Sequence, residues 1–202
     1  MNYVEPLESR TLLSVASPAQ SLIADAKTLV VDFRSLVKAN TANRKLLVSD
    51  LKEAGEFTES KTLVATLNND AYAGYLAAGR SVVRAQARIR SDLLHFTILS
   101  GRLAADPGNV ELQARVATAQ QTLQSDAAAR LSAATSAITS WLDANSRNIG
   151  AIVSANSGNS RLASDVTNTI GPRAQAASAT LQSALTTLLT TDANAVTGLS
   201  QS

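Results

Sequence analysis

Residues 116–152 read VATAQQTLQSDAAARLSAATSAITSWLDANSRNIGAI, and this stretch decides the fold. Its apolar residues recur at steps of three and four positions, and the steps from Val116 to Ile152 average about 3.6 residues, which is the period of an α-helix. The pattern predicts one long helix that buries a single stripe. The stripe consists of Val116, Ala119, Leu123, Ala127, Leu131, Ala134, Ile138, Trp141, Asn145, Ile149 and Ile152.

The same period continues on both sides of this stretch and predicts four amphipathic segments, at residues 18–67, 71–105, 109–155 and 160–191. Turn-forming residues separate them, namely Asn-Asn-Asp at 68–70, Asp-Pro-Gly-Asn at 106–109 and Asn-Ser-Gly-Asn at 156–159. No credible strand alternates apolar and polar residues. Short connections make long helices antiparallel neighbours. We therefore expect an all-α fold, an elongated antiparallel up-and-down bundle of about four long helices.

Two of these segments contain possible breaks. Within 18–67, either residues 40–43 or Gly55 can divide the helix in two, and the sequence leaves both open. Within 160–191, Gly171-Pro172 is expected to kink or split the helix, because proline has no amide hydrogen to donate.

The start of the helical region is predicted at Ser17-Pro18-Ala19-Gln20. Ser17 can cap the helix, proline suits its first position, and Gln20 can complete a capping box. This divides the chain into an N-terminal segment (1–16), a helical bundle (17–192) and a frayed tail (193–202).

The composition excludes several kinds of chemistry. The chain has no Cys, so it has no disulfide, no thiolate nucleophile and no Cys-based zinc or iron–sulfur site. It has one His, no Glu-x-x-His motif and no glycine-rich phosphate loop. We therefore expect neither a metal nor a cofactor. No run of about 18 apolar residues could span a membrane, and a formal net charge of +2 is too small to indicate a nucleic-acid or membrane partner.

One short motif suggests where the protein is located. Residues 4–14 read VEPLESRTLLS. This resembles the N-terminal sorting-type motif called LEPR-XLL of planctomycete proteins, which is Leu-Glu-Pro-Arg, one variable residue and Leu-Leu. The residues that match it are Leu7, Glu8, Arg10, Leu12 and Leu13, and Ser9 stands where the family has proline. The resemblance implies export or surface sorting, and it implies no activity for the helical body.

The residues themselves give a weaker signal for export. The apolar run from Leu12 to Ala16 is too short for a secretory signal, and no basic side chain precedes Arg10. The alternative is a disordered or loosely packed N-terminus. A location outside the cytoplasm or at the cell surface is expected, and a cytoplasmic location remains the alternative.

An arginine-rich helix face is the main candidate for binding. Arg80, Arg84 and Arg88 fall within about 80° of arc on a helix, and Arg102 and His95 fall in the same sector. Guanidinium groups there suit the carboxylate or phosphate groups of a polysaccharide, a nucleic acid or an acidic protein. The alternative is a solvated face, or pairing with acids of a neighbouring helix. No aromatic residues interleave the arginines, which weakens the case for single-stranded nucleic acid.

The single His has two possible roles. His95 lies three and four positions after Asp92 and Ser91, so the three can meet on one helix face. A surface ion pair is preferred over a lone general base, because nothing in the sequence supplies an oxyanion pocket.

Three further candidates are better explained by structure. Trp141 lies on the apolar stripe and is expected in the core rather than on a ligand platform, and Asn145 at a core position can fix register or oligomeric state. A solvated helix flank is preferred over a metal site for Glu53, Glu56 and Glu59.

These observations predict a non-enzymatic, exported or surface-associated helical module with a structural or protein-interaction role, whose partner is another protein or a second copy. The alternative is an anion-binding module for polysaccharide or nucleic acid that uses Arg80, Arg84, Arg88 and Arg102. Binding to a polyanion should weaken steeply with salt, and apolar helix association should not.

Overall fold

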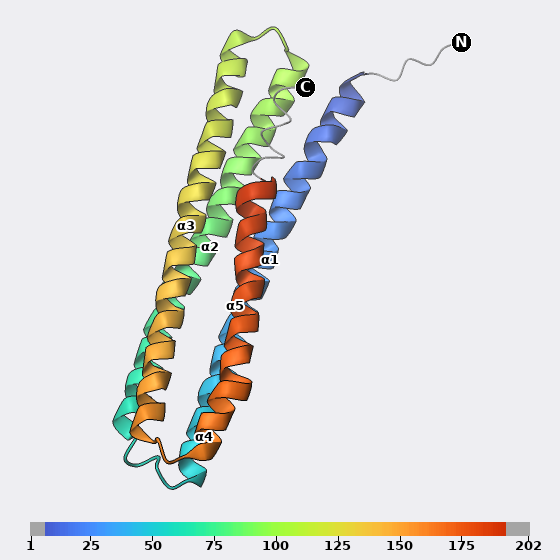
Figure 1. Ribbon diagram of the computed structural model, residues 1–202. Coiled ribbons are helices and arrows are strands. Elements are labelled where there is room, and N and C mark those ends of the chain that lie inside the picture. Colours follow the sequence, from blue (N-terminus) through green and yellow to red (C-terminus); the bar gives the residue numbers. More distant parts are fainter. Residues whose placement is uncertain (1–6, 193–202) are drawn as a thin grey trace, which may run out of the picture. The chain divides into compact units, whose positions relative to one another are not determined.

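The structure is a computed structural model that describes the backbone of residues 7–192 and the side chains of residues 20–190. The described residues are helical between short connections and contain no strand, which confirms the all-α class (Figure 1). The elements are α1 (Leu7–Glu53), α2 (Lys61–Ala105), α3 (Val110–Ala155), α4 (Ser160–Asp165), η1 (Val166–Ile170), α5 (Gly171–Thr186) and η2 (Thr187–Asp192), where η denotes a π-helix.

The long helices contribute to two compact units. Of the described residues, 7–30, 83–132 and 184–192 form the first unit, and 31–82 and 133–183 form the second unit. The connection at 106–109 reverses the chain within the first unit, and those at 54–60 and 156–159 reverse it within the second (Figure 1). Helices joined by these three connections are therefore antiparallel within their unit, whereas α4, η1 and α5 follow one another without a reversal, and the predicted helical bundle is confirmed.

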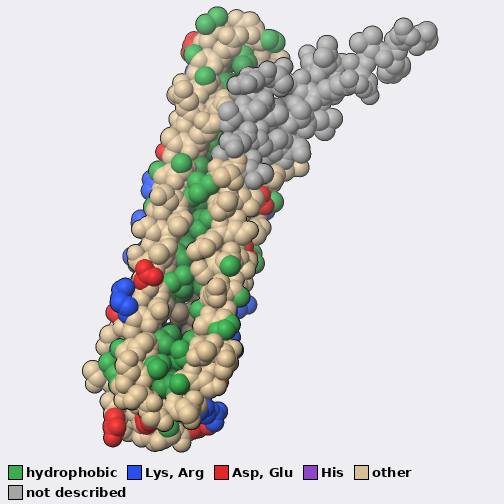
Figure 2. Space-filling view, in the orientation of Figure 1, with side chains coloured by type: hydrophobic (Ala, Val, Ile, Leu, Met, Phe, Trp, Pro, Cys, Tyr) green, Lys and Arg blue, Asp and Glu red, His purple; other side chains and the backbone are tan. Residues whose placement is uncertain are grey.

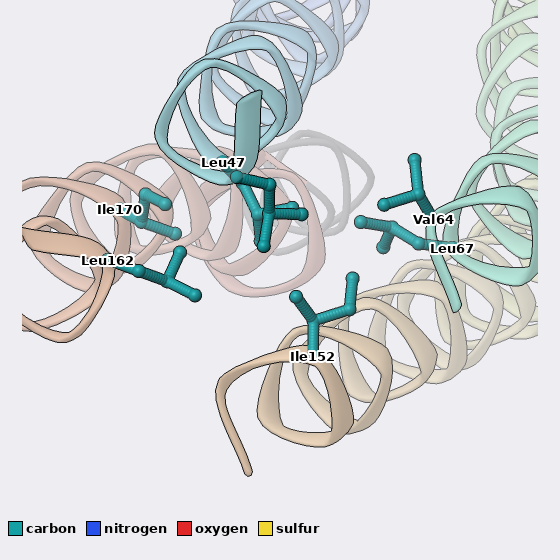
Figure 3. Packing of buried hydrophobic residues seen from close by; sticks show 7 residues of the cluster. Leu47, Val64, Leu67, Ile152, Leu162 and Ile170 are labelled. Atoms are coloured by element: carbon teal, nitrogen blue, oxygen red, sulfur yellow. The ribbon is translucent and has the colours of Figure 1, made fainter. Parts of the chain in front are cut away.

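The core is built from aliphatic side chains, as the composition predicts. In the second unit, buried side chains from α1, α2, α3, α4 and η1 pack together in one cluster (Figure 3). Its members are Leu47 and Leu51 of α1, Val64 and Leu67 of α2, Ile152 of α3, Leu162 of α4 and Ile170 of η1. Each such side chain contributes roughly 1.5–3 kcal/mol on full burial. The predicted stripe of α3 is buried at every position except Ile149, which is half-buried.

The first break in the chain lies at Gly55, one of the two alternatives predicted for the segment 18–67, so this segment is divided between α1 and α2. Gly55 has a φ of 78°, a left-handed conformation that costs glycine little. Its amide donates to the carbonyl of Lys52 (3.1 Å), and the Glu56 amide donates to that of Leu51 (2.8 Å). These bonds satisfy carbonyls at the end of α1. Residues 40–43, the other possible break, lie within α1.

The turn predicted at residues 68–70 is wrong, because these residues lie inside α2. Their polar side chains bond neighbouring helices instead of their own backbone. Asn68 Oδ1 accepts from Arg44 Nη1 of α1 (3.1 Å), and Asp70 Oδ2 accepts from Asn148 Nδ2 of α3 (2.9 Å). A turn preference that depends on local side-chain bonds is lost when tertiary partners take those bonds.

The predicted helix start at Ser17 is wrong as well, because α1 begins at Leu7. Pro18 therefore lies inside the helix, where its missing amide removes one backbone hydrogen bond. A capping motif contributes only about 1 kcal/mol and does not prevent the preceding residues from being helical. The side chains of the sorting-type motif lie outside the described residues, as do residues 1–6 and the predicted tail at 193–202.

The later boundaries agree with the sequence. The predicted helix at 109–155 is observed as Val110–Ala155, and α2 ends at Ala105 as expected. Asn159 caps α4 by accepting from the Leu162 amide (2.9 Å). Gly171-Pro172 disrupts the last segment as predicted: the Gly171 amide donates to the carbonyl of Val166, five residues earlier, which makes a π-helical turn.

Candidate functional site

The four arginines of the predicted face are all exposed on α2. Arg84, Arg88 and Arg102 belong to the first unit, whereas Arg80 belongs to the second. Charged side chains are sparse on the face of the molecule drawn in Figure 2. In the first unit α2 and α3 run beside each other, and Arg84 and Arg88 lie along this seam.

Arg88 is held by two carboxylates, one from each helix. Its Nε donates to Asp126 Oδ2 of α3 (2.6 Å) and lies 3.1 Å from Asp92 Oδ2 of α2. The hydrogen bond to Asp126 raises the pKa of the Arg88 guanidinium, and the charge of Asp92 adds to this effect. Pairing with a neighbouring helix, one of the two alternatives for this face, thus holds for Arg88.

Asp92 is the buried member of this group, with a side chain 9% exposed. Burial raises the pKa of the Asp92 carboxyl, the positive charge of Arg88 opposes the shift, and the nearby carboxylate of Asp126 adds to it. Asp92 and Asp126 thus both lie against the same guanidinium group, one from each helix.

Two adjoining hollows lie along the α2–α3 seam of the first unit, and we call them together the seam trough. The first, of about 560 Å³, is lined by Arg88, Ser91, Asp92, His95 and Leu99 of α2 and by Glu111, Ala114, Arg115, Thr118, Ala119 and Thr122 of α3. The second, of about 500 Å³, is lined by Arg84, Ala87, Arg88 and Ser91 of α2 and by Arg130 of α3. Arg88 and Ser91 line both hollows, and the second hollow has no acidic lining residue.

Sequence reasoning missed Arg115 and Arg130. Both lie on the exposed flank of α3, and the predicted stripe marks that flank as solvent-facing. The period alone does not give the rotation of α3 against α2, so it could not show which arginines of the two helices share a hollow.

Ser91, Asp92 and His95 lie together on one helix face, as predicted, since all three line the first hollow. Among the described residues, however, no ion pair joins His95 to Asp92, and Asp92 pairs with Arg88 instead. The arginine lies four positions before Asp92 on the same helix face, and its longer side chain reaches the carboxylate.

The three glutamates do not share a helix flank, because α1 ends at Glu53. Glu53 pairs with Arg161 of α4, and Glu56 Oε2 accepts from Asn159 Nδ2 (2.8 Å). These contacts fix the 54–60 connection to the start of α4. No group of three or more Asp, Glu or His side chains within residues 20–190 is arranged to hold a metal ion.

A buried carboxylate in the second unit has no counterpart in the sequence analysis. The Asp50 side chain is 0% exposed, and Arg161 Nε lies 3.2 Å from its Oδ1. Burial raises the pKa of Asp50 most, Asp165 raises it further through its charge and a hydrogen bond, and Arg161 acts in the opposite direction. The sequence pattern around Asp50 does not show that its carboxylate is buried.

Replacing Asp50 by Asn should raise the melting temperature at pH 7 by about 2–4 °C, on the order of 1 kcal/mol for a chain of this size. Because the pKa is raised in the folded state, the folded chain binds the proton more tightly, and stability falls as the pH rises above the ordinary value of 3.8. The advantage of Asp50→Asn should therefore disappear below about pH 4. Asp143→Asn, at an exposed position of α3, is the control, and it should change neither the melting temperature at pH 7 nor its dependence on pH. A variant less stable than wild type at pH 7 would contradict the prediction.

Trp141 lies in the core of the second unit, 3% exposed, as predicted. Its ring centroid is 6.0 Å from that of Phe33, which in turn stacks on Tyr75 at 6.2 Å. Asn145 is also 3% exposed, and neither of its amide atoms has a hydrogen-bond partner. The predicted core position of Asn145 is thus confirmed.

An apolar strip on the outside of α2 was not recognised in the sequence. In the first unit Val83, Leu94 and Ile98 are 54%, 61% and 48% exposed. Their spacings of eleven and four residues place them within about 60° of arc on the helix. The strip lies opposite the buried stripe of α2 and beside the arginine sector.

Comparison with protein-family models, with curated proteins and with solved structures finds no match for the chain. Among the described helices, none has a stretch that is both long and apolar enough to cross a membrane.

Proposed function

We propose that the chain is a non-enzymatic helical module that binds an acidic amphipathic helix of a partner protein. The observation that carries the proposal is the exposed apolar strip of Val83, Leu94 and Ile98 on α2. Partner helices commonly bind through apolar anchors at helical spacing. Covering these half-exposed side chains would contribute on the order of 1 kcal/mol each.

Charge decides which helix fits. Arg84 and Arg102 lie on one flank of the strip, and Arg90 lies on the other; all three are exposed. The only acidic residue between 71 and 105 is Asp92, which is buried. A second copy would bring the same positive flanks together, so the strip favours a helix whose apolar face is bordered by Asp or Glu.

We further propose that the module acts outside the cytoplasm or at the cell surface, in a structural or protein-interaction role. This part depends on the sorting-type resemblance of Leu7, Glu8, Arg10, Leu12 and Leu13. Cell fractionation and the N-terminal mass of the native protein test it. Full-length protein found only in the cytoplasm would overturn it.

The binding proposal is tested with a synthetic helical peptide of heptad pattern that has Leu at its core positions and Glu on both flanks. We expect Leu94→Ser/Ile98→Ser to weaken binding at least tenfold, because two apolar anchors are lost. Val110→Ser, which changes a still more exposed valine (75%) at the start of α3, is the control and should bind as wild type. A Lys-flanked peptide should bind more weakly than the Glu-flanked one.

Two results would overturn this proposal. One is equal affinity of the double variant and wild type for the Glu-flanked peptide. The other is a dimer in sedimentation equilibrium that Leu94→Ser/Ile98→Ser abolishes, which would make a second copy the occupant. The alternative function is binding of an anionic polymer through Arg80, Arg84, Arg88 and Arg102. Of these four, only Arg84 and Arg88 line the seam trough.

A further inference from the structure

We infer that the second hollow of the seam trough binds the sulfate or carboxylate groups of an acidic polysaccharide. The hollow is lined by Arg84, Arg88 and Arg130 together with Ser91 and Ala87. None of the strip's apolar anchors (Val83, Leu94 and Ile98) lines this hollow, and Arg84 is the one residue that both proposals use.

The arginines come from two antiparallel helices and converge without an acidic residue in the lining. Arg84 and Arg130 are exposed and have no ion pair among the described residues. Their guanidinium groups are therefore free to bind an oxyanion in the two-pronged geometry that favours arginine over lysine.

Arg88 is the fixed member of the set. Its Nε is held by Asp126, and among the described residues its terminal Nη atoms make no hydrogen bond. A guanidinium positioned in this way loses less side-chain freedom when a ligand binds. The Asp126 carboxylate thus orients Arg88 rather than blocking it.

The lining favours a polysaccharide over a nucleic acid. The Ser91 hydroxyl lines both hollows and can bond the hydroxyl groups of sugars. Thr118 and Thr122 line the first hollow, and because their hydroxyls donate to the carbonyls of Ala114 and Thr118, they offer sugars acceptor oxygens only. No Phe, Tyr or Trp lines either hollow. Single-stranded nucleic acids are usually bound by stacking on aromatic rings. Both hollows are shallow and open to solvent, and because Arg88 and Ser91 line both, they adjoin along the seam, which suits a linear polymer.

The trough also changes character along its length. Arg115 continues the arginine lining in the first hollow, which also contains the acidic residues Asp92 and Glu111. Because the second hollow lacks such an acid, it is the stronger anion subsite, and removal of Arg84 and Arg130 is the most direct test.

The test uses the full chain and three probes: a heparin fragment, polygalacturonate and single-stranded oligo(dT). We expect Arg84→Gln/Arg130→Gln to weaken heparin binding about tenfold and to lower the slope of log affinity against log salt by about two, one for each arginine. Because both side chains are exposed, the melting temperature should not change. If the chain also binds polygalacturonate, carboxylate groups are sufficient for binding. If it binds heparin and not polygalacturonate, sulfate is the group bound.

The control is Arg34→Gln/Arg147→Gln, which removes the same charge from exposed arginines of the second unit. It should bind heparin as wild type does. An equal loss in this control, or no loss in Arg84→Gln/Arg130→Gln, would overturn the inference. Tighter binding of oligo(dT) than of either polysaccharide, lost in the same variant, would overturn the polysaccharide assignment. Leu94→Ser/Ile98→Ser should bind heparin normally, so the two proposals fail separately.

Discussion

Gly74→Ala should lower the free energy of unfolding by about 1–3 kcal/mol, although alanine normally stabilises a helix. A Cβ at Gly74 of α2 would lie 2.3 Å from Cδ1, 2.7 Å from Cγ and 3.0 Å from Cβ of Trp141. These atoms are the part of the Trp141 side chain nearest the backbone, and its rigid indole ring is packed against Phe33. The indole cannot move away without disturbing the aromatic contacts of the second unit.

The matched control is the same substitution on the same helix. A Cβ at Gly101 of α2 would meet nothing within 4 Å, so Gly101→Ala should raise stability by about 0.5–1 kcal/mol. Chemical denaturation of both variants measures the two values. Opposite signs are expected, and a stabilised Gly74→Ala variant would mean that the indole does not lie against this glycine.

Much of the fold could be predicted because burial in a bundle repeats every 3.6 residues. The stripe of α3 shows this most clearly, since every residue chosen by period alone is buried except Ile149, which is half-buried. The π-turn before Pro172 was also foreseeable as a disruption, because the missing amide of proline is a property of one residue and needs no tertiary contact.

The position of the first break could not be predicted for a physical reason. Asn68 and Asp70 have the composition of a turn, but their side chains bond Arg44 and Asn148 on other helices. Gly55 ends α1 by adopting a left-handed backbone, which the sequence permits without requiring. The sequence offers residues 40–43 and Gly55 as alternative breaks, and the choice between them depends on contacts that exist only after the helices pack.

The candidate site shows the same limit. Exposure of Arg84 and Arg88 follows from their place on the helix wheel, and the structure agrees. Their association with Arg130, and the capture of Arg88 by Asp126, depend on how α2 and α3 are rotated against each other. A period defines which face is buried, and it does not define which exposed side chains of two helices meet.

Two buried asparagines of the second unit should respond in opposite ways to the same change. Asn43 and Asn145 are each 3% exposed. Asn43 Nδ2 donates to the carbonyl of Ile170 (3.0 Å), and Asn43 Oδ1 accepts from Arg173 Nη1 (2.9 Å). Asn145 makes no hydrogen bond through its side chain. A buried polar group without a hydrogen bond lowers the stability of the folded chain. Removing one member of a buried hydrogen bond leaves its partner unpaired, at a similar cost in stability.

We therefore expect Asn43→Leu to destabilise the chain by about 2–3 kcal/mol, because it leaves the Ile170 carbonyl unpaired beside the π-turn and deprives Arg173 of its acceptor. Asn145→Leu should stabilise it by about 1–2 kcal/mol, because an apolar side chain of similar branching replaces an unsatisfied amide. Any overpacking by leucine acts against both variants, so the difference between them isolates the hydrogen bonds. Thermal and chemical denaturation measure it, and a loss in Asn145→Leu as large as in Asn43→Leu would show that the Asn145 amide is paired. A stabilised Asn145→Leu variant that also changed its sedimentation would assign the buried amide to the choice of oligomeric state, the role that asparagine plays at core positions of coiled coils.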